Sequence, residues 1–370
     1  MKVAVVRNHE NRGVIGRFGQ PCPEKYAESH VQGVVGALRE GGHTVAVFEG
    51  DLTLPANLQQ FMPSDAAAGL PTGMVFNMAY GIQGQCRYTH VPALLETAGV
   101  PYTGASPFGH VLSQDKVVSK ILMRDAGIPT PAFCVASHPD CDPGELHFPL
   151  IVKPRHESTS YGLRLVGSRE ELSNAIRVIL TDYEQNALVE QYIEGREICV
   201  GLLGNEPAVE LLPLVELDFE GRQLQVVTWD DKYHKRPDEP KKSCPVDLPH
   251  HLEEKLRQIA LAVFRVCHCQ DYARVDLRID RSGNPQVLEI NSMASLGPRA
   301  SYVVAATNAG YSLTSLVCRI LDVAHQRYFG VPAPRPAPDT RQTADGAPSA
   351  REAASAKQEA AAVTGLSTQT

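Results

Sequence analysis

The segment Ala273–Asn291 constrains the fold of this chain more than any other, because its pattern predicts a β-hairpin. In its first half, apolar residues alternate with charged ones, and successive side chains of a strand point to opposite faces. The pair Ser282-Gly283 suits the tip of a tight turn between the two strands. The segment therefore predicts two antiparallel strands with one apolar face and one polar face.

Two carboxylates oppose each other in this predicted hairpin. A two-residue loop pairs Asp276 with Glu289 and Arg274 with Asn291. Opposed like charges destabilise a sheet by up to about 1 kcal/mol, so neutralising either carboxylate should leave the metal-free protein level or slightly more stable. Two carboxylates and an amide oxygen are hard ligands that Mg²⁺ accepts when nucleotide phosphates complete its shell. The pattern favours a metal site, with a solvated hairpin whose charges pair with arginines as the alternative.

The first 112 residues read as alternating strands and helices. Residues 28–40 carry apolar side chains at helical spacing before Gly41-Gly42, and another helix is expected over residues 92–98. Strands are expected at residues 2–6, 44–51 and 73–79. This alternation indicates a parallel sheet with crossover helices. The sequence therefore predicts an α/β N-terminal domain over residues 1–112.

Residues 113–330 read as a second, larger α/β domain. A continuous apolar strand ends at Lys153, and a polar loop follows it. We expect a smaller subdomain over residues 113–198 and a larger one over residues 199–330. Residues 331–370 are rich in Ala, Pro, Ser and Thr and lack aromatic side chains, so we expect a disordered tail there.

Composition and charge exclude several classes of partner. The formal net charge is −7 and no basic run offsets it, so we expect no nucleic-acid partner. No apolar stretch reaches the roughly 20 residues that cross a bilayer, so we expect no membrane partner. The N-terminus lacks the features of a signal peptide, which predicts a cytoplasmic protein. The nine cysteines are scattered, and the cluster 267–269 lacks a second ligand pair at zinc-site spacing.

Several segments, taken in order, resemble the ATP-grasp superfamily and, within it, the D-alanine–D-alanine ligases. The predicted hairpin resembles the metal-binding end of that fold, and LLETAGVPYTGASPFGHVLSQDKVVSK resembles the stretch that contains the first ATP-binding lysine. The family's remaining positions are occupied by FPLIVKP, LVEQYIEGREI, DDKYH and LEINSMASLG. The resemblance covers residues 2–330. It implies an α/β protein with an ATP-grasp fold preceded by a Rossmann-like N-terminal (pre-ATP-grasp) domain.

The resemblance implies how the chain would bind ATP. Lys116 and Lys153 would hold the phosphates, and residues 157–162, hereafter the covering loop, would fold over them, with Ser160 as a catalytic hydroxyl. Phosphoryl transfer to a carboxylate brings two anions together, so lysines suit these positions. The remaining implied contacts are Glu190 and the backbone of Ile193 at the adenine, Glu197 at the ribose, and Lys232 elsewhere on the nucleotide.

The resemblance also implies the roles of the hairpin. Asp276, Glu289 and Asn291 would bind two Mg²⁺ ions, with Mn²⁺ as an alternative metal. Arg274 would steady the oxyanion that develops during the reaction, and Tyr233 would line the substrate site.

Departures from the family pattern concentrate on the substrate side. The covering loop reads Ser158-Thr159-Ser160 where Gly-Ser-Ser is common, and the usually acidic, Gly-rich segment before the PYTG helix contains Gln85 and Arg87. The N-terminal loop lacks the family's acidic turn that fixes the first amino group, and Glu28 is the predicted replacement. We therefore expect amino acids or a peptide as substrates, without a specific identity.

The implied activity is an ATP-dependent carboxylate–amine ligase that acts through an acyl phosphate on small molecules. A homodimer is compatible with this activity. One alternative is an ATP-grasp kinase that phosphorylates a small molecule without ligation. Another is a nucleotide-binding regulatory module that has lost the chemistry, although the joint presence of Arg274, Asp276, Glu289 and Asn291 counts against it.

Overall fold

A computed structural model describes residues 1–10, 13–65, 70–219, 222, 225–229, 231 and 239–334 of the chain. Residues 1–334 form one compact unit, and residues 335–370 form a second unit that lies outside the described residues. The predicted disorder of the tail concerns mainly that second unit. No helix within the described ranges is both long enough and apolar enough to span a membrane.

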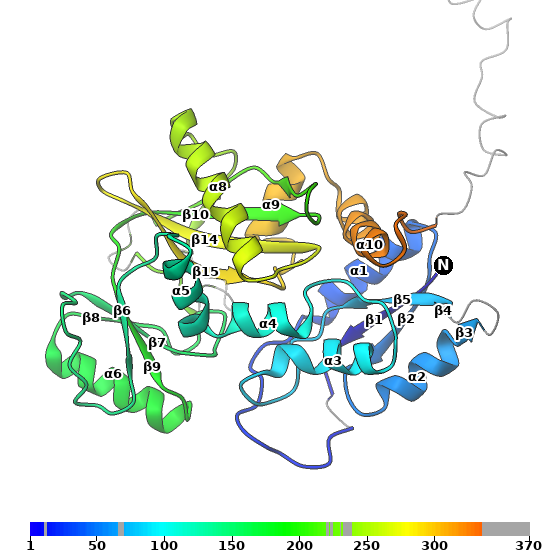
Figure 1. Cartoon of the computed structure of the whole chain (residues 1–370), viewed down its shortest axis with the longest axis horizontal. Helices are drawn as coiled ribbons and strands as arrows, with labels where there is room; N and C mark the ends of the chain where they lie inside the picture. Colours follow the sequence, from blue (N-terminus) through cyan, green and yellow to red (C-terminus); the bar gives the residue numbers. More distant parts are fainter. Residues whose placement is uncertain are drawn as a thin grey trace, which may run out of the picture. The chain divides into compact units, whose positions relative to one another are not determined.

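The N-terminal part is built around a parallel sheet with strand order β2-β1-β5 (Figure 1). Successive apolar side chains of its central strand β1 point to opposite faces of the sheet, and each face packs in a separate hydrophobic core. Val3 and Val5 face α1, whereas Ala4 and Val6 face α2 and α3. The elements are β1 (Lys2–Arg7), α1 (Glu28–Glu40), β2 (Thr44–Glu49), α2 (Leu54–Phe61), β3 (Ser64–Asp65), β4 (Leu70–Pro71), β5 (Gly73–Asn77), η1 (Arg87–Thr89), α3 (His90–Thr97) and α4 (Pro107–Gln114).

The middle part is an antiparallel sheet with strand order β6-β9-β7-β8. Helix α6 packs on one face, where Leu172 and Ile176 contact Leu150 and Val152 of the sheet. Lys153 of β7 and Glu190 of β9 belong to the opposite face. The elements are α5 (Lys116–Asp125), β6 (Phe133–Ala136), β7 (Leu150–Pro154), β8 (Arg164–Val166), α6 (Arg169–Asp182) and β9 (Ala187–Gln191).

The C-terminal part is a larger antiparallel sheet with strand order β13-β12-β10-β14-β15, and β11 pairs with β10. Helix α8 covers one face (Figure 1), where Leu256 and Val263 pack against Val275 and Leu277. The elements are β10 (Gly195–Leu203), β11 (Glu210–Leu211), β12 (Val215–Asp218), β13 (Lys241–Ser243), α8 (His250–Val266), β14 (Tyr272–Asp280), β15 (Pro285–Asn291), α9 (Ser301–Asn308) and α10 (Leu313–Phe329).

Most elements expected from periodicity are present, and the helix over residues 28–40 has the predicted bounds. The sequence pattern missed the helices α2, α4 and α9, which are only eight residues long each and give little periodic signal. The three larger sheets fall within the ranges 1–112, 113–198 and 199–330, except that β10 begins at Gly195, and the two-stranded sheet β3-β4 lies within the first range. The division of residues 1–334 into domains remains a prediction, because the N-terminal and C-terminal parts share one hydrophobic core between α1 and α10.

The first compact unit continues four residues past the predicted start of the tail at residue 331, to Pro334. Helix α10 ends at Phe329, and the left-handed conformation of the next residue, Gly330, turns the chain back. Ala333 is buried, and its backbone N–H donates to Asp322 Oδ1 at 3.2 Å. Four residues that pack back against a helix are too few to change the local composition. The sequence therefore predicted that the tail begins directly after the helix.

Candidate active site

One cavity of about 660 Å³ is lined by every predicted nucleotide-binding, metal-binding and catalytic residue that the structure describes. These residues come from α5, β7, the covering loop, β9, the turn after β9, β10 and the hairpin β14–β15. They are Lys116, Lys153, Ser160, Glu190, Ile193, Glu197, Arg274, Asp276, Glu289 and Asn291. Lys232 and Tyr233 lie outside the described residues, so their predicted positions stay predictions.

The hairpin has the predicted pairing at the site. Asp276 faces Glu289 and Arg274 faces Asn291 across β14 and β15. The predicted two-residue loop is wrong, because Asp280 pairs with Asn284 through the backbone and three residues form the loop. A loop of that length alone would have shifted the register by one residue and separated the two carboxylates.

A β-bulge restores the register. Leu277 faces Val287, so Leu288 is one extra residue on β15 next to the site. The three-residue loop ends at Gly283, whose φ of 83° suits the left-handed position of such loops. The loop and the bulge each displace the register by one residue in opposite directions, and the carboxylates therefore meet.

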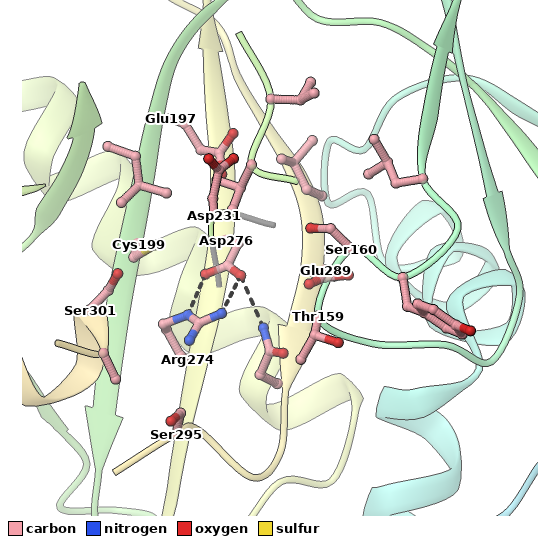
Figure 2. Close-up of a pocket in the computed structure, with 18 of the residues that line it drawn as sticks. Thr159, Ser160, Glu197, Cys199, Asp231, Arg274, Asp276, Glu289, Ser295 and Ser301 are labelled. Atoms are coloured by element: carbon pink, nitrogen blue, oxygen red, sulfur yellow. Dashed lines mark hydrogen bonds and ion pairs between the residues drawn. The ribbon is translucent and has the colours of Figure 1, made fainter. Parts of the chain in front are cut away.

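The carboxylate of Asp276 is engaged on both oxygens. Arg274 donates from Nε and Nη2 to Asp276 Oδ1 and Oδ2, both at 2.7 Å, and Asn291 Nδ2 donates to Oδ2 at 3.0 Å (Figure 2). Burial alone would lower the pKa of Arg274, but Asp276 raises it above its ordinary value. The ion pair fixes the guanidinium in the cavity. Arg274 therefore already compensates the charge of Asp276, so the pair of like charges is not bare and the expected effect of neutralising Asp276 changes sign.

The donor set of the hairpin fits a divalent cation that is shared with phosphates. In the described part of the chain, no group of three or more His, Cys, Asp and Glu side chains is arranged to hold a metal ion by itself. The hairpin instead offers two carboxylates, Asp276 and Glu289, and the amide oxygen of Asn291. These hard oxygen donors leave coordination positions for phosphate and water, which is the usual arrangement of Mg²⁺ in nucleotide enzymes.

Lys116 is aimed into the cavity by the start of α5. Asp115 caps the helix by accepting from the backbone N–H groups of Val117 and Val118 at 3.0 and 3.1 Å. Lys116 Nζ donates to the backbone C=O of Glu157 and lies 3.9 Å from Glu289 Oε2. Burial lowers the pKa of Lys116, while Glu289 opposes the decrease. The ammonium thus lies between the covering loop and the candidate metal ligands.

Glu190 is held between two lysines. Its Oε1 lies 2.6 Å from Lys120 Nζ and its Oε2 lies 2.6 Å from Lys153 Nζ, and all three side chains are buried. Burial alone would raise the pKa of Glu190, but the two ammonium groups lower it. Burial lowers the pKa of Lys120 to about 8. Sequence reasoning missed Lys120, although its position four residues after Lys116 puts both on one helix face.

Glu197 is oriented by an arginine that the sequence did not single out. Arg278 donates to Glu197 Oε2 from Nε at 3.0 Å and from Nη2 at 2.8 Å, and to the C=O of Ile193 at 2.9 Å. Its guanidinium lies over the rings of Tyr192 and Phe219. Arg278 therefore connects Ile193, a predicted adenine contact, to Glu197, the predicted ribose contact. The strand alternation that placed Asp276 on the polar face also placed Arg278 there, and this was the available signal.

Glu24, and not the predicted Glu28, contributes a carboxylate to the cavity wall. Glu28 is ion-paired with Arg7 and does not line the cavity. Glu24 lines the cavity, is buried, and accepts hydrogen bonds from the hydroxyls of Tyr88 and Ser158. Glu24 lies in a long irregular loop and meets Ser158 134 residues later in the chain, so no local pattern marked it.

The chain matches a known family over more than half of its length. Residues 122–322 match the family model described as D-ala D-ala ligase C-terminus. An uncharacterised protein, y4sG, of Sinorhizobium fredii is 52% identical over 334 residues, which cover 89% of this chain and 98% of that protein. The D-alanine–D-alanine ligase of Alcanivorax borkumensis is 37% identical over 243 residues, which cover 65% of this chain and 74% of the relative.

Solved structures show the same fold. The crystal structure of the D-alanine–D-alanine ligase from Bacillus anthracis complexed with ATP has a TM-score of 0.64 at 21% identity, and the alignment covers 88% of this chain and 98% of that one. A second structure of that enzyme has a TM-score of 0.66 at 20% identity. The ATP-grasp fold predicted from the sequence is confirmed. The chain belongs to the D-alanine–D-alanine ligase family, and it is an ATP-dependent ligase that joins a carboxylate to an amine.

Proposed function

We propose that the protein joins two amino-acid or peptide substrates, with the first held through its ammonium group by Glu24. The observation that carries this proposal is the position of Asp276 and Glu289, opposed on one wall of a cavity that Lys116 and Lys153 also line. The relative from Alcanivorax borkumensis is a D-alanine–D-alanine ligase, which supports amino acids as the substrate class. ATP as a substrate supports a cytoplasmic location for the reaction.

The described residues suggest a division of roles. ATP, bound with Mg²⁺, supplies the phosphoryl group that converts the substrate carboxylate into an acyl phosphate. Lys116 and Lys153 would neutralise the phosphates, and Asp276, Glu289 and Asn291 would hold Mg²⁺ or Mn²⁺.

The second half of the reaction needs a donor for the oxyanion. Attack of the amine on the acyl phosphate creates a tetrahedral intermediate, which then expels phosphate. Arg274, fixed by Asp276, would donate to its oxyanion, and fixed donors of this kind favour the transition state. Ser160 of the covering loop would contribute its hydroxyl, and the loop would exclude water from the acyl phosphate.

Ligation predicts that ADP and phosphate appear together, and only when a carboxylate and an amine acceptor are both present. Pairs of amino acids and short peptides, D-alanine included, should be supplied with ATP and Mg²⁺, and both products measured. Omission of Mg²⁺ is the control. ADP formed with a phosphorylated small molecule and no free phosphate would indicate the kinase alternative. ATP turnover that ignores every amino acid and peptide would contradict ligation.

Glu24 and Glu28 provide a matched test of the substrate side. Glu24→Gln should raise the KM of the first substrate by about ten- to a hundredfold, because a hydrogen bond to a charged group contributes about 1.5–3 kcal/mol. Glu28→Gln should leave that KM unchanged, since Glu28 lies outside the cavity. Initial rates at varied substrate and saturating ATP measure both values. An equal KM for the wild type and Glu24→Gln would remove Glu24 from the substrate site.

A further inference from the structure

The covering loop is fixed to the N-terminal part of the chain by a buried ion pair. Arg87 Nη2 lies 3.0 Å from Glu157 Oε2, and the two side chains are only 1% and 3% exposed. Gln185 Nε2 donates to the other carboxylate oxygen of Glu157 at 2.6 Å. The guanidinium thus reaches the loop from η1, 70 residues earlier in the chain. Arg87 is also one of the residues at which this chain departs from the acidic pattern of the family.

Two further contacts connect this ion pair to the reacting groups. The backbone C=O of Glu157 accepts a hydrogen bond from Lys116 Nζ, so the position of Glu157 affects an ammonium that faces the candidate metal ligands. The next residue, Ser158, donates its hydroxyl to Glu24 on the substrate side. A displacement of Glu157 would therefore move contacts on both sides of the cavity.

The loop beyond these anchors has a conformation that needs support. Thr159 and Ser160 have φ values of 55° and 59°, a left-handed region that costs residues other than glycine about 1–2 kcal/mol each. At the far end of the loop, the ring of Tyr161 lies 4.7 Å from Trp229 and 5.0 Å from Tyr183, measured between ring centroids. The strained pair is thus held between a polar anchor on one side and an aromatic anchor on the other.

We propose that Arg87 is a positioning residue for phosphoryl transfer, which acts through Glu157 to hold the covering loop and Lys116 where the ATP phosphates bind. This inference rests on the proposed function of the cavity. Replacing a buried ion pair by apolar residues is often neutral for stability, so stability alone is a weak reason to bury an arginine here. A fixed geometry is a stronger reason, because misplacement of a catalytic contact by about 1 Å can reduce a rate a hundredfold.

Trp229 is the sole tryptophan of the chain and contacts Tyr161 of the covering loop in a tilted arrangement, so its fluorescence reports the position of the loop. In Arg87→Gln, we expect a red shift of the Trp229 emission and stronger quenching by acrylamide in the nucleotide-free protein. The dissociation constant for the ATP analogue AMP-PNP with Mg²⁺ should rise by about tenfold or more, because Lys116 loses its fixed partner. Arg87→Lys keeps the charge without the planar fork, and it should show the same changes to a smaller extent.

The control is another arginine–carboxylate pair, in which the carboxylate is buried and the arginine is partly buried. Arg327 lies 2.8 Å from Asp271 and does not line the cavity. Arg327→Gln should lower the melting temperature but leave the Trp229 emission and the AMP-PNP affinity unchanged. In addition, Arg87→Gln combined with Glu157→Gln should weaken affinity no more than the worse single change, because the pair acts as one unit.

The Trp229 emission and the AMP-PNP affinity distinguish failure of the Arg87 proposal from failure of the proposed function. If Trp229 emission and AMP-PNP affinity in Arg87→Lys and Arg87→Gln equal those of the wild type, Arg87 has no positioning role. The emission tests the loop position in the absence of nucleotide. Absence of AMP-PNP binding in the wild type would instead overturn the proposed function, whatever the emission shows.

Discussion

Replacing Asp276 with Asn, or Glu289 with Gln, should reduce Mg²⁺-dependent turnover by about a hundredfold or more, a loss on the order of 3 kcal/mol in transition-state stabilisation. The two carboxylates face each other across β14 and β15, and a cation held by both is lost when either is removed. The double variant should therefore be little worse than the worse single variant. Turnover measured against Mg²⁺ concentration for the wild type, both singles and the double tests this.

The same variants should differ in stability when metal is removed with EDTA. Asp276→Asn leaves the Arg274 guanidinium buried without its carboxylate, so the free energy of unfolding should fall, by about 3–5 kcal/mol. Glu289→Gln removes a charge opposite Asp276 and should leave stability level or slightly higher. Full activity in either single variant, or additive losses without a change in Mg²⁺ dependence, would contradict the metal assignment.

Replacing Glu190 with Gln should lower the free energy of unfolding by about 3–5 kcal/mol, because a buried charge loses its compensation. Lys120 and Lys153 each lie 2.6 Å from this carboxylate, and both are buried. With a neutral amide at position 190, the buried ammonium groups of Lys120 and Lys153 would lie near each other without a compensating negative charge. Urea denaturation at neutral pH measures the change.

Glu194→Gln is the control for this variant. Glu194 is paired with Arg281, but both side chains are more than half exposed, so the change should be below about 0.5 kcal/mol. Equal stabilities of the Glu190 and Glu194 variants would show that the two lysines do not depend on Glu190. If Glu190→Gln weakens nucleotide binding without loss of stability, the adenine contact implied by the family would be its main role.

The sequence by itself determined the features that depend on local periodicity. Alternation along β14 put Arg274, Asp276 and Arg278 on one face, since the side-chain period of a strand is two. Helical spacing gave the bounds of α1, and the order of short motifs gave the ATP-grasp fold. Such signals are readable because the partners that define them lie within a few residues of one another.

Only the tertiary structure decided which distant side chains meet. Glu24 rather than Glu28 contacts the covering loop, and Arg87 contacts Glu157. The pairing of Asp276 with Glu289 was predicted from a loop length that is wrong, and it holds because the bulge at Leu288 cancels the error. Contacts between residues 70 or more positions apart leave no periodic trace in the sequence, because the intervening chain and its packing determine them.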